Sequence, residues 1–199
     1  MTSRPWAAKG RGLPCVPSPE MREAVTDEDL ARAAADGDAA AFSALLERHY
    51  DRLLGLLWRL TGARAEAEDL LQDICERLPA KLGGFRGEAR FATWLWRVAV
   101  NAAHDRRRRL AARGRAAEGW GDWEVAREAA MSEGREREAW LMGALGRLPP
   151  PLRDTLALVL DEATHAEAGR VLGVSEGTVS WRVSEAKRRL RRMREEDGA

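Results

Sequence analysis

Apolar residues recur at intervals of three and four along most of this chain, which is the spacing of amphipathic helices. The longest such pattern runs from about Ala40 to Leu60, and Thr61-Gly62 ends it. Its apolar face consists of Phe42, Leu45, Leu46, Tyr50, Leu53, Leu54, Leu57 and Leu60. A shorter helix is predicted before it, capped by Thr26 and ending near Asp36. Alternation typical of strands is scarce, so the pattern predicts an all-α fold.

The segment 65–109 is predicted to form two helices joined by a glycine-rich loop. The apolar stripe of the first helix consists of Ala67, Leu70, Leu71, Ile74 and Leu78. An acidic, hydrogen-bonding stripe on another face consists of Asp69, Gln72, Asp73 and Glu76. This stripe fits either a solvated surface or a docking face for a basic protein, and the spacing alone favours the first. Pro79 is expected to end the helix, because proline lacks the backbone N–H that a helix interior needs.

A basic loop from Lys81 to Arg90 follows and holds the aromatic residue Phe85. The second helix places Phe91, Leu95, Val98 and Ala102 inward. Phe91 and either Trp94 or Trp96 are expected in the core. Arginines lie along the helix at Arg90, Arg97 and Arg106–Arg109. Aromatic faces beside basic residues suit phosphates and unstacked bases, so the segment suggests an adaptor between a protein and a nucleic acid.

The second half of the chain ends in a pattern with helix-turn-helix spacing. Thr164 is predicted to cap a helix through Leu172, Gly173-Val174 to form the turn, and Ser175 to cap the last helix. The inward positions of that last helix are Val179, Val183, Ala186 and Leu190. Similar spacing also occurs in helical pairs that bind no DNA, so the pattern alone leaves both readings open.

These patterns predict two small helical domains joined by a flexible linker. Residues 1–25 contain four prolines and no periodicity, which indicates a disordered tail. The first domain is placed at residues 26–110, the linker at 111–135 and the second domain at 136–194. The linker contains Trp120 and Trp123, for which docking on a partner and incidental exposure are equally reasonable.

Charge is segregated along the chain although the net charge of the 199 residues is only +1. Residues 101–115 hold six arginines against one aspartate, and residues 182–194 hold six arginines and one lysine against one glutamate. Local patches rather than the total set the field that phosphates experience, so nucleic-acid binding remains compatible with this composition.

Several classes of function are disfavoured by what the sequence lacks. No nucleophile with its base, metal triad or phosphate-cradling glycine loop is recognisable, so no catalytic residue, metal, cofactor or small-molecule substrate is expected. Cys15 and Cys75 have the spacing of neither a disulfide framework nor a metal site. No apolar run approaches the ~20 residues of a membrane span, and no signal peptide is evident, which predicts a cytoplasmic protein.

The stretch FRGEARFATWLWRVAVNAAHDRRRR resembles the second conserved region of bacterial RNA polymerase sigma factors of the small extracytoplasmic-function (ECF) group, group IV. Residues 65–78 resemble the helix of that family that binds core polymerase, and the resemblance extends from about Asp27 to Arg192. It implies a transcription initiation factor with an N-terminal helical bundle, sigma region two, and a C-terminal helix-turn-helix, sigma region four. Its expected partners are core RNA polymerase, promoter DNA and an anti-sigma factor.

The resemblance also implies roles for particular residues. Contact with core polymerase is expected from Asp69, Gln72, Asp73 and Glu76. Recognition and melting of the minus-ten element are expected from Phe85, Arg86, Arg90, Trp94, Arg97, Asn101, Arg106 and Arg107. Recognition of the minus-thirty-five element is expected from Glu176, Gly177, Thr178, Ser180, Trp181, Arg182, Ser184, Glu185, Lys187 and Arg188. Trp181 and Glu185 replace the arginines or small polar residues usual in the family, which predicts unusual promoter specificity.

A stand-alone helix-turn-helix regulator that binds an operator as a dimer is the main alternative. Such a regulator has no reason to carry the acidic helix together with FRGEARFATWLWRVAVN. A nucleic-acid enzyme is a third class, and it lacks the acid–base or metal residues that its chemistry requires.

Overall fold

The computed structural model describes residues 25–114 and 133–198, and within these ranges it contains helices and no strand. In chain order the helices are α2 (Asp27–Ala35), α3 (Ala39–Thr61), α4 (Arg64–Leu82), α5 (Phe91–Gly114), α6 (Glu133–Arg147), α7 (Pro150–Leu160), α8 (His165–Leu172) and α9 (Glu176–Glu196). The predicted all-α fold is therefore confirmed. The predicted tail up to residue 24, Trp120 and Trp123 lie outside the described residues.

The first half is a bundle in which α3 packs against α2, α4 and α5. Its central side chains are Leu45, Leu56, Leu57, Leu60, Leu71 and Phe91, all at most 2% exposed. Local sequence fixes where these helices begin. Thr26 accepts a hydrogen bond from the Asp29 backbone, and Asp38 accepts from Ala40 and Ala41, so both α2 and α3 have side-chain caps.

The expectation that Pro79 ends its helix is wrong, because α4 continues to Leu82 with the proline inside it. A proline at this position removes one backbone hydrogen bond near the end of the helix. The next turn, however, carries Leu82, whose side chain is fully buried in the core. Burial of a leucine contributes about 1.5–3 kcal/mol, which is enough to offset one missing bond.

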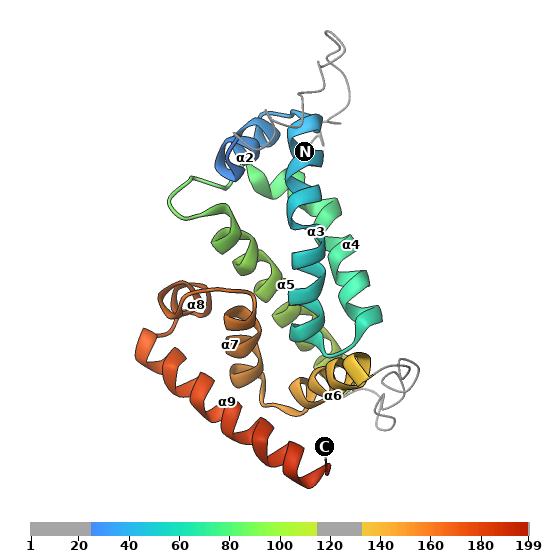
Figure 1. The fold of residues 1–199 in the computed structure, drawn as a ribbon. Coiled ribbons are helices and arrows are strands. Elements are labelled where there is room, and N and C mark those ends of the chain that lie inside the picture. The colour runs from blue at the N-terminus through green and yellow to red at the C-terminus, as the bar shows by residue number, and fades with distance from the viewer. Residues whose placement is uncertain (1–24, 115–132, 199) are drawn as a thin grey trace.

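The helices α6–α9 lie directly against the first half. In Figure 1 they occupy the lower part of the molecule, with α9 along its outer edge. α6 and α7 contact α3, and α8 contacts α5. Leu158, Val171 and Val179 belong to the same contiguous apolar core as the side chains of α3 and α5. A smaller core forms around Leu145 and Leu156, and Trp58 of α3 packs against it.

The pair α8–α9 forms the predicted helix-turn-helix. Thr164 and Glu167 form a reciprocal capping box at the start of α8, and the Ser175 hydroxyl accepts from the Thr178 backbone at the start of α9. Gly173 adopts a φ of +67° in the turn. A Cβ at Gly169 would lie 2.8 Å from the Val174 carbonyl oxygen, so the backbone of the turn approaches α8 closely there. The predicted caps Thr164 and Ser175 are confirmed.

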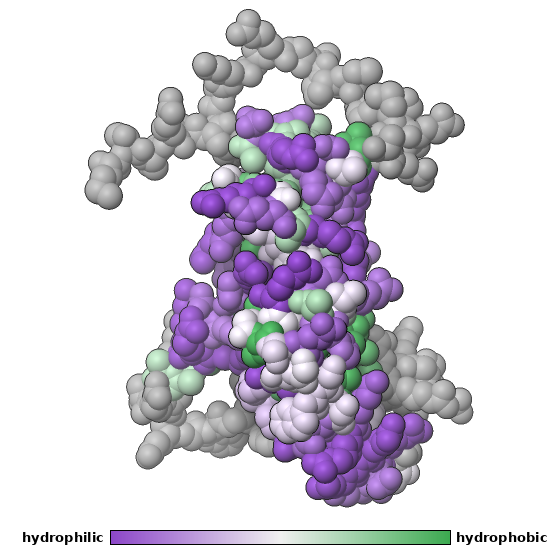
Figure 2. All heavy atoms as spheres, turned by 90° about the vertical axis from the view of Figure 1, so that its left-hand side faces the viewer, coloured by the Kyte–Doolittle hydropathy of each residue, from purple (hydrophilic) through white to green (hydrophobic). Residues whose placement is uncertain are grey.

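None of the described helices is both long and apolar enough to cross a membrane. Figure 2 shows one face of the molecule as largely hydrophilic, with small hydrophobic areas between the charged side chains.

Candidate protein and nucleic-acid interfaces

The acidic stripe lies along one exposed side of α4. Asp69, Gln72 and Glu76 are exposed and Asp73 is half-buried, while Leu70, Leu71 and Ile74 are buried on the other side of the helix. The Gln72 amide donates to the Glu76 carboxylate at 3.2 Å. The exposed Asp69 carboxylate forms an ion pair with the half-buried Arg106 of α5 at 3.8 Å. The structure thus brings the four predicted docking residues together on a single surface.

Aromatic rings hold the loop between α4 and α5 in place. Phe85 in the loop packs edge-on against Phe91 and Trp94, with ring centroids 5.6 and 5.7 Å apart. Phe91 is buried and also meets the ring of His49 at 5.2 Å. Of the two tryptophans, Trp96 is the one that serves the core, and Trp94 is only half-buried. Phe85 and Trp94 are therefore the two predicted base-binding aromatic residues, and both rings remain partly exposed to solvent.

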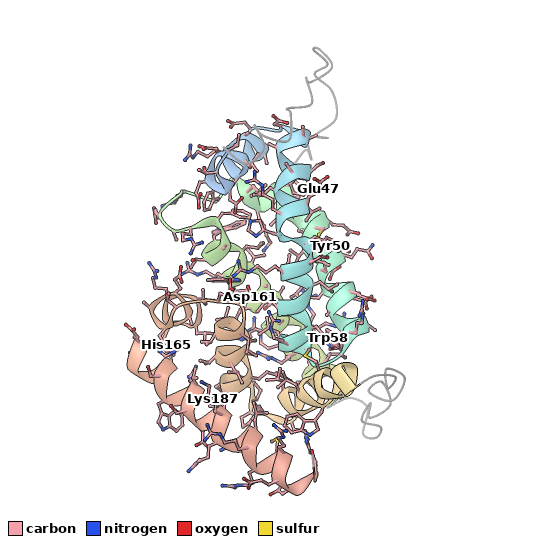
Figure 3. All side chains as sticks on the ribbon, in the orientation of Figure 1. Glu47, Tyr50, Trp58, Asp161, His165 and Lys187 are labelled. Atoms are coloured by element: carbon pink, nitrogen blue, oxygen red, sulfur yellow. The ribbon has the colours of Figure 1, made fainter. Side chains whose placement is uncertain are left out.

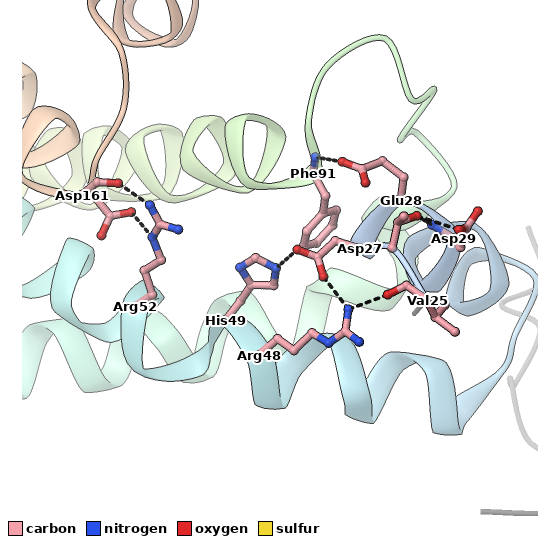
Figure 4. A network of polar contacts seen from close by, with 10 residues as sticks. Val25, Asp27, Glu28, Asp29, Arg48, His49, Arg52, Phe91 and Asp161 are labelled. Atoms are coloured by element: carbon pink, nitrogen blue, oxygen red, sulfur yellow. Dashed lines mark hydrogen bonds and ion pairs between the residues drawn. The ribbon is translucent and has the colours of Figure 1, made fainter. Parts of the chain in front are cut away.

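Polar contacts join α2 to the middle of α3 and to the first turn of α5 (Figure 4). The Asp27 carboxylate lies 2.9 Å from the Arg48 guanidinium and 2.7 Å from the His49 ring nitrogen. Glu28 accepts a hydrogen bond from the backbone N–H of Phe91 at 2.9 Å. A residue of α2 thus pairs one of the backbone N–H groups that the first turn of α5 would otherwise leave without a partner. Burial would raise the pKa of Asp27, but the hydrogen bonds from Arg48 and His49 outweigh it and lower that pKa.

Several of the predicted DNA-binding residues in α5 and directly before it contact the second half of the chain. The Arg107 guanidinium binds both carboxylate oxygens of Asp154 in α7, at 2.8 and 2.7 Å. Arg97 donates to the backbone carbonyl of Arg170 at 3.0 Å. Arg90 lies 3.8 Å from Glu167, whose pKa is lowered mainly by its hydrogen bonds with Thr164. Arg86 and Asn101 are exposed and lie outside these contacts.

Asp161, just after α7, is the most heavily bound carboxylate between the two halves. It is 5% exposed and accepts from Arg52 at 2.9 Å, from Arg59 at 2.8 Å and from the Trp96 indole at 2.6 Å. Figure 3 places it in the middle of the molecule, beside α3. Burial lowers the pKa of the Arg59 guanidinium, and the Asp161 carboxylate counteracts part of that effect. An uncompensated charge here would be costly, so the cluster depends on all of its partners.

The predicted minus-thirty-five residues lie at the start and along the outer side of α9. Glu176, Gly177, Ser180, Ser184, Lys187 and Arg188 are exposed, and Thr178 and Arg182 are half-buried. Trp181 is 63% exposed, the largest exposure among the large hydrophobic residues of the described ranges. The Ser180 hydroxyl lies 2.9 Å from the His165 ring of α8.

Glu185 does not occupy the freely outward position that the helical spacing predicts. Its side chain is only 10% exposed and is bound by Arg188 and by Arg189, the latter at 2.7 Å. Both contacts lower the pKa of Glu185, and the hydrogen bond from Arg189 has the larger effect. Long arginine side chains one turn away fold over the carboxylate, an arrangement that periodicity alone does not reveal.

The interface carboxylates Asp154, Asp161 and Glu167 were missed by the sequence interpretation. One signal was available: Arg153 and Asp154 are charged residues inside the apolar run of α7, and both are buried. Among the described residues, no three His, Cys, Asp or Glu side chains gather as a metal ion requires. Cys75 is half-buried, and burial raises the pKa of its thiol, which favours the unreactive form.

Comparison with known proteins assigns both halves of the chain to described families. The family model Sigma-70 region 2 matches residues 45–113, and the model Sigma-70, region 4 matches residues 138–190. The chain is 36% identical over 170 residues to the ECF RNA polymerase sigma factor SigM of Mycobacterium tuberculosis, and the match covers 84% of each chain. It is 30% identical over 179 residues to the RNA polymerase sigma-H factor of Pseudomonas aeruginosa, covering 81% of this chain and 90% of that protein.

Solved structures share the fold. CnrH in complex with the cytosolic domain of CnrY superposes with a TM-score of 0.65 at 24% identity, covering 86% of this chain and 98% of that one. The sigma factor RpoE in complex with the anti-sigma factor NepR from Bartonella quintana gives a TM-score of 0.64 at 22% identity, with 76% and 94% covered.

Proposed function

This chain belongs to the ECF RNA polymerase sigma factors, and from that premise we propose how its helices divide the work of promoter recognition. The protein binds core RNA polymerase and directs transcription initiation at particular promoters, acting as an initiation factor rather than as an enzyme by itself. In the proposal, residues 26–110 bind core polymerase and the minus-ten element, residues 136–194 bind the minus-thirty-five element, and residues 111–135 connect them.

Core polymerase docks on the acidic stripe of α4. The observation that carries this assignment is the exposed side of α4 with Asp69, Gln72, Asp73 and Glu76, opposite a side packed into the core. These carboxylates complement a basic protein surface, and such charge complementarity increases the rate and specificity of association. Because this stripe lies on the outer side of α4, core polymerase can reach it without a rearrangement of the helices.

The minus-ten element is held by the loop after α4 and by α5. Phe85 and Trp94 offer half-exposed rings on which an unstacked base of the melted strand can stack. Arg86 and Asn101 are exposed beside them, and Arg90, Arg97, Arg106 and Arg107 supply cations for phosphates. Rings that are already fixed by packing lose little freedom when they bind a base.

The minus-thirty-five element is read by α9 in the major groove. Glu176, Gly177 and Thr178 form the first turn of α9, where backbone N–H groups can bind a phosphate. Trp181 is positioned to pack on a thymine methyl group or a sugar. Lys187 and Arg188 supply phosphate contacts, whereas Glu185 acts through Arg188 and Arg189.

An anti-sigma factor is the proposed inhibitor. The structural relatives CnrH and RpoE were solved with the cytosolic domain of CnrY and with the anti-sigma factor NepR, respectively. A partner of this kind would cover the DNA-binding helices until it is released. The proposal places the protein in the cytoplasm, where core polymerase is found, and in group IV of the family.

The assignment of α4 is tested by reversing its charge. We expect the double variant Asp69→Lys/Asp73→Lys to weaken association with core polymerase by about tenfold or more, because like charges then face the basic partner surface. Binding is measured by fluorescence anisotropy and promoter opening by run-off transcription.

Glu47→Lys/Asp51→Lys is the matched control, since both residues are exposed on α3 with the same spacing of four. It should bind core polymerase like the wild type. Unchanged association of the α4 variant would contradict the docking assignment. DNA binding and promoter recognition that are indifferent to polymerase would instead indicate a stand-alone regulator.

A further inference from the structure

The second half of α9 carries positive charge on the same side of the helix as the residues proposed to read the minus-thirty-five element. Residues three and four positions apart lie on one face of a helix. The side that presents Trp181 and Ser184 therefore continues to Arg188, Arg191 and Arg192, and all five residues are exposed. The last two arginines of this side lie beyond the residues for which a contact with the element is proposed.

The charges of Arg191 and Arg192 are available to a ligand. Among the described residues, neither of them forms an ion pair with a carboxylate, and both are exposed. A cation near the C-terminus of a helix can also stabilise the helix through its dipole, but this effect is confined to the last turn. In α9 that turn contains Glu195 and Glu196. Helix stability therefore does not account for the two arginines.

The opposite side of this part of α9 is fixed to the rest of the second half. Leu190 and Met193 pack against the smaller apolar core. The Asp197 carboxylate, directly after α9, accepts from the Trp140 indole at 3.0 Å and from Arg147 at 2.6 Å. Both partners belong to α6, beside which α9 ends (Figure 1). The arginines are thus presented on a helix whose end is held in place, so little freedom is lost when they bind.

The length of α9 places these arginines outside the bases that the helix can read. A helix-turn-helix contacts base edges with the first turns of its second helix, in a major groove about 12 Å wide. At about 1.5 Å per residue, Arg191 lies roughly 20 Å along the helix axis from Thr178 in the first turn. The part of α9 that carries Arg191 and Arg192 therefore extends beyond the bases, to the phosphates at the edge of the groove.

We propose that Arg191 and Arg192 form a second DNA-binding site on α9, which binds the phosphate backbone of the duplex just outside the minus-thirty-five element. A guanidinium can donate two parallel hydrogen bonds to a phosphate. The site adds affinity without reading sequence, because the phosphate groups are the same at every base pair. The inference rests on the proposed function of α9 and goes beyond it, since base reading alone requires no duplex outside the element.

The site is tested with Arg191→Gln/Arg192→Gln in the complex with core polymerase, on a promoter duplex that the wild type transcribes. We expect about tenfold weaker binding at about 0.1 M salt, and a slope of log affinity against log salt that is smaller by about two. The ratio of affinities for the intact element and for an element with one changed base pair should equal that of the wild type. A misfolded α9 would lower this ratio, so the ratio separates loss of the site from loss of structure.

Arg32→Gln/Arg64→Gln is the matched control, because it removes the same charge from exposed side chains of α2 and α4. It should keep the DNA affinity and the salt dependence of the wild type. An equal reduction of the slope by this control would mean that total charge, and not a site on α9, determines the effect, and would overturn the proposal.

Trimming the duplex locates the contact on the DNA. The base pairs flanking the minus-thirty-five element are removed first on one side and then on the other, and each duplex is bound to complexes with the wild type and with the double variant. The tenfold difference between the two proteins should disappear on one trimmed duplex and remain on the other. A difference that remains on both would place the contact within the element, contrary to the proposal.

The wild-type complex also tests the function on which the site depends. If it shows no preference for the element over a scrambled sequence, base reading by α9 is rejected and the site with it. If the wild type has that preference and the double variant keeps wild-type affinity and salt slope, only the phosphate site is rejected.

Discussion

Asp27 joins the first turn of α2 to α3 through Arg48 and His49, and its pKa is lowered below the ordinary value of 3.8. A carboxyl group with a depressed pKa in the folded state stabilises the fold above its unfolded pKa, and that contribution is lost as the pH falls through the folded pKa. We expect Asp27→Asn to lower the free energy of unfolding by about 1–2 kcal/mol at pH 7, since the site is partly exposed. The difference from the wild type should stay constant down to about pH 5 and shrink below about pH 4.

Urea denaturation at several pH values measures this difference. Asp51→Asn is the control, because Asp51 is exposed on α3 and carries the same charge. A stability difference for Asp27→Asn that is independent of pH down to pH 3 would mean that the ionised carboxylate does not stabilise this junction.

Trp181 is the residue of α9 with the clearest opportunity for specific readout, since its ring is exposed and apolar. We expect Trp181→Ala to relax discrimination at one base pair of the minus-thirty-five element by about 1–3 kcal/mol. Run-off transcription on a set of single-base-pair promoter variants measures this. Arg188→Ala is the comparison, because loss of a phosphate contact weakens binding to all sequences alike. An equally uniform loss for Trp181→Ala would assign the ring to the sugar–phosphate backbone.

At the scale of residues, the sequence predicts core positions better than polar partners. It predicts that Phe91 and one tryptophan are buried, but Trp94 and Trp96 are two positions apart on an apolar helix. Tertiary contacts decide between them: Trp96 packs in the core and its indole donates to Asp161. The contact of Glu28 with Phe91 spans 63 residues and has no periodic signature. Local spacing therefore cannot reveal it.

At the scale of elements, the turn of α8–α9 depends on the absence of a side chain at Gly169. A Cβ there would lie 2.8 Å from a backbone oxygen, which cannot move without displacing the turn. We expect Gly169→Ala to lower the free energy of unfolding by about 1–3 kcal/mol, as overpacking does in other cores. Gly143→Ala in α6 is the matched control: nothing lies within 4 Å of its Cβ position, so it should be neutral or stabilising by about 0.5–1 kcal/mol. Thermal unfolding of both variants measures the two effects, and destabilisation of equal size would contradict the steric account.

The beginnings of helices are predictable from sequence where the signal is local, as the caps Thr26, Thr164 and Ser175 demonstrate. The end of α4 is not, because burial of Leu82 is a tertiary effect that overrides the local preference of Pro79. The same limit applies to Glu185, where two arginines of α9 compete with solvent for the carboxylate.

At the scale of the whole molecule, the division into two helical units follows from composition and periodicity, but their closed packing does not. Arg52, Arg59 and Asp161 look like ordinary surface charges in the sequence, yet Asp161 is buried between the halves with both arginines bound to it. Asp161 lies 109 positions from Arg52 and 102 positions from Arg59 in the sequence, so no local motif reveals that they pair. The surface of α5 that we propose to bind promoter DNA thus also contacts the second half of the chain, through Arg107 and Asp154.

Two nearby arginines of α5 can separate the contact with the second half from the proposed contact with DNA, because Arg107 binds Asp154 whereas Arg109 is exposed. In the complex with core polymerase and promoter, we expect Arg107→Ala and Arg109→Ala each to reduce the slope of log affinity against log salt by about one, as loss of one phosphate contact does. In the free chain only Arg107→Ala should increase the radius of gyration, because only that change removes a contact with Asp154 of α7. Salt titrations of the complex and scattering of the free variants measure the two effects separately. Equal expansion of both free variants would show that the total charge of α5, and not the pairing of Arg107 with Asp154, keeps the chain closed.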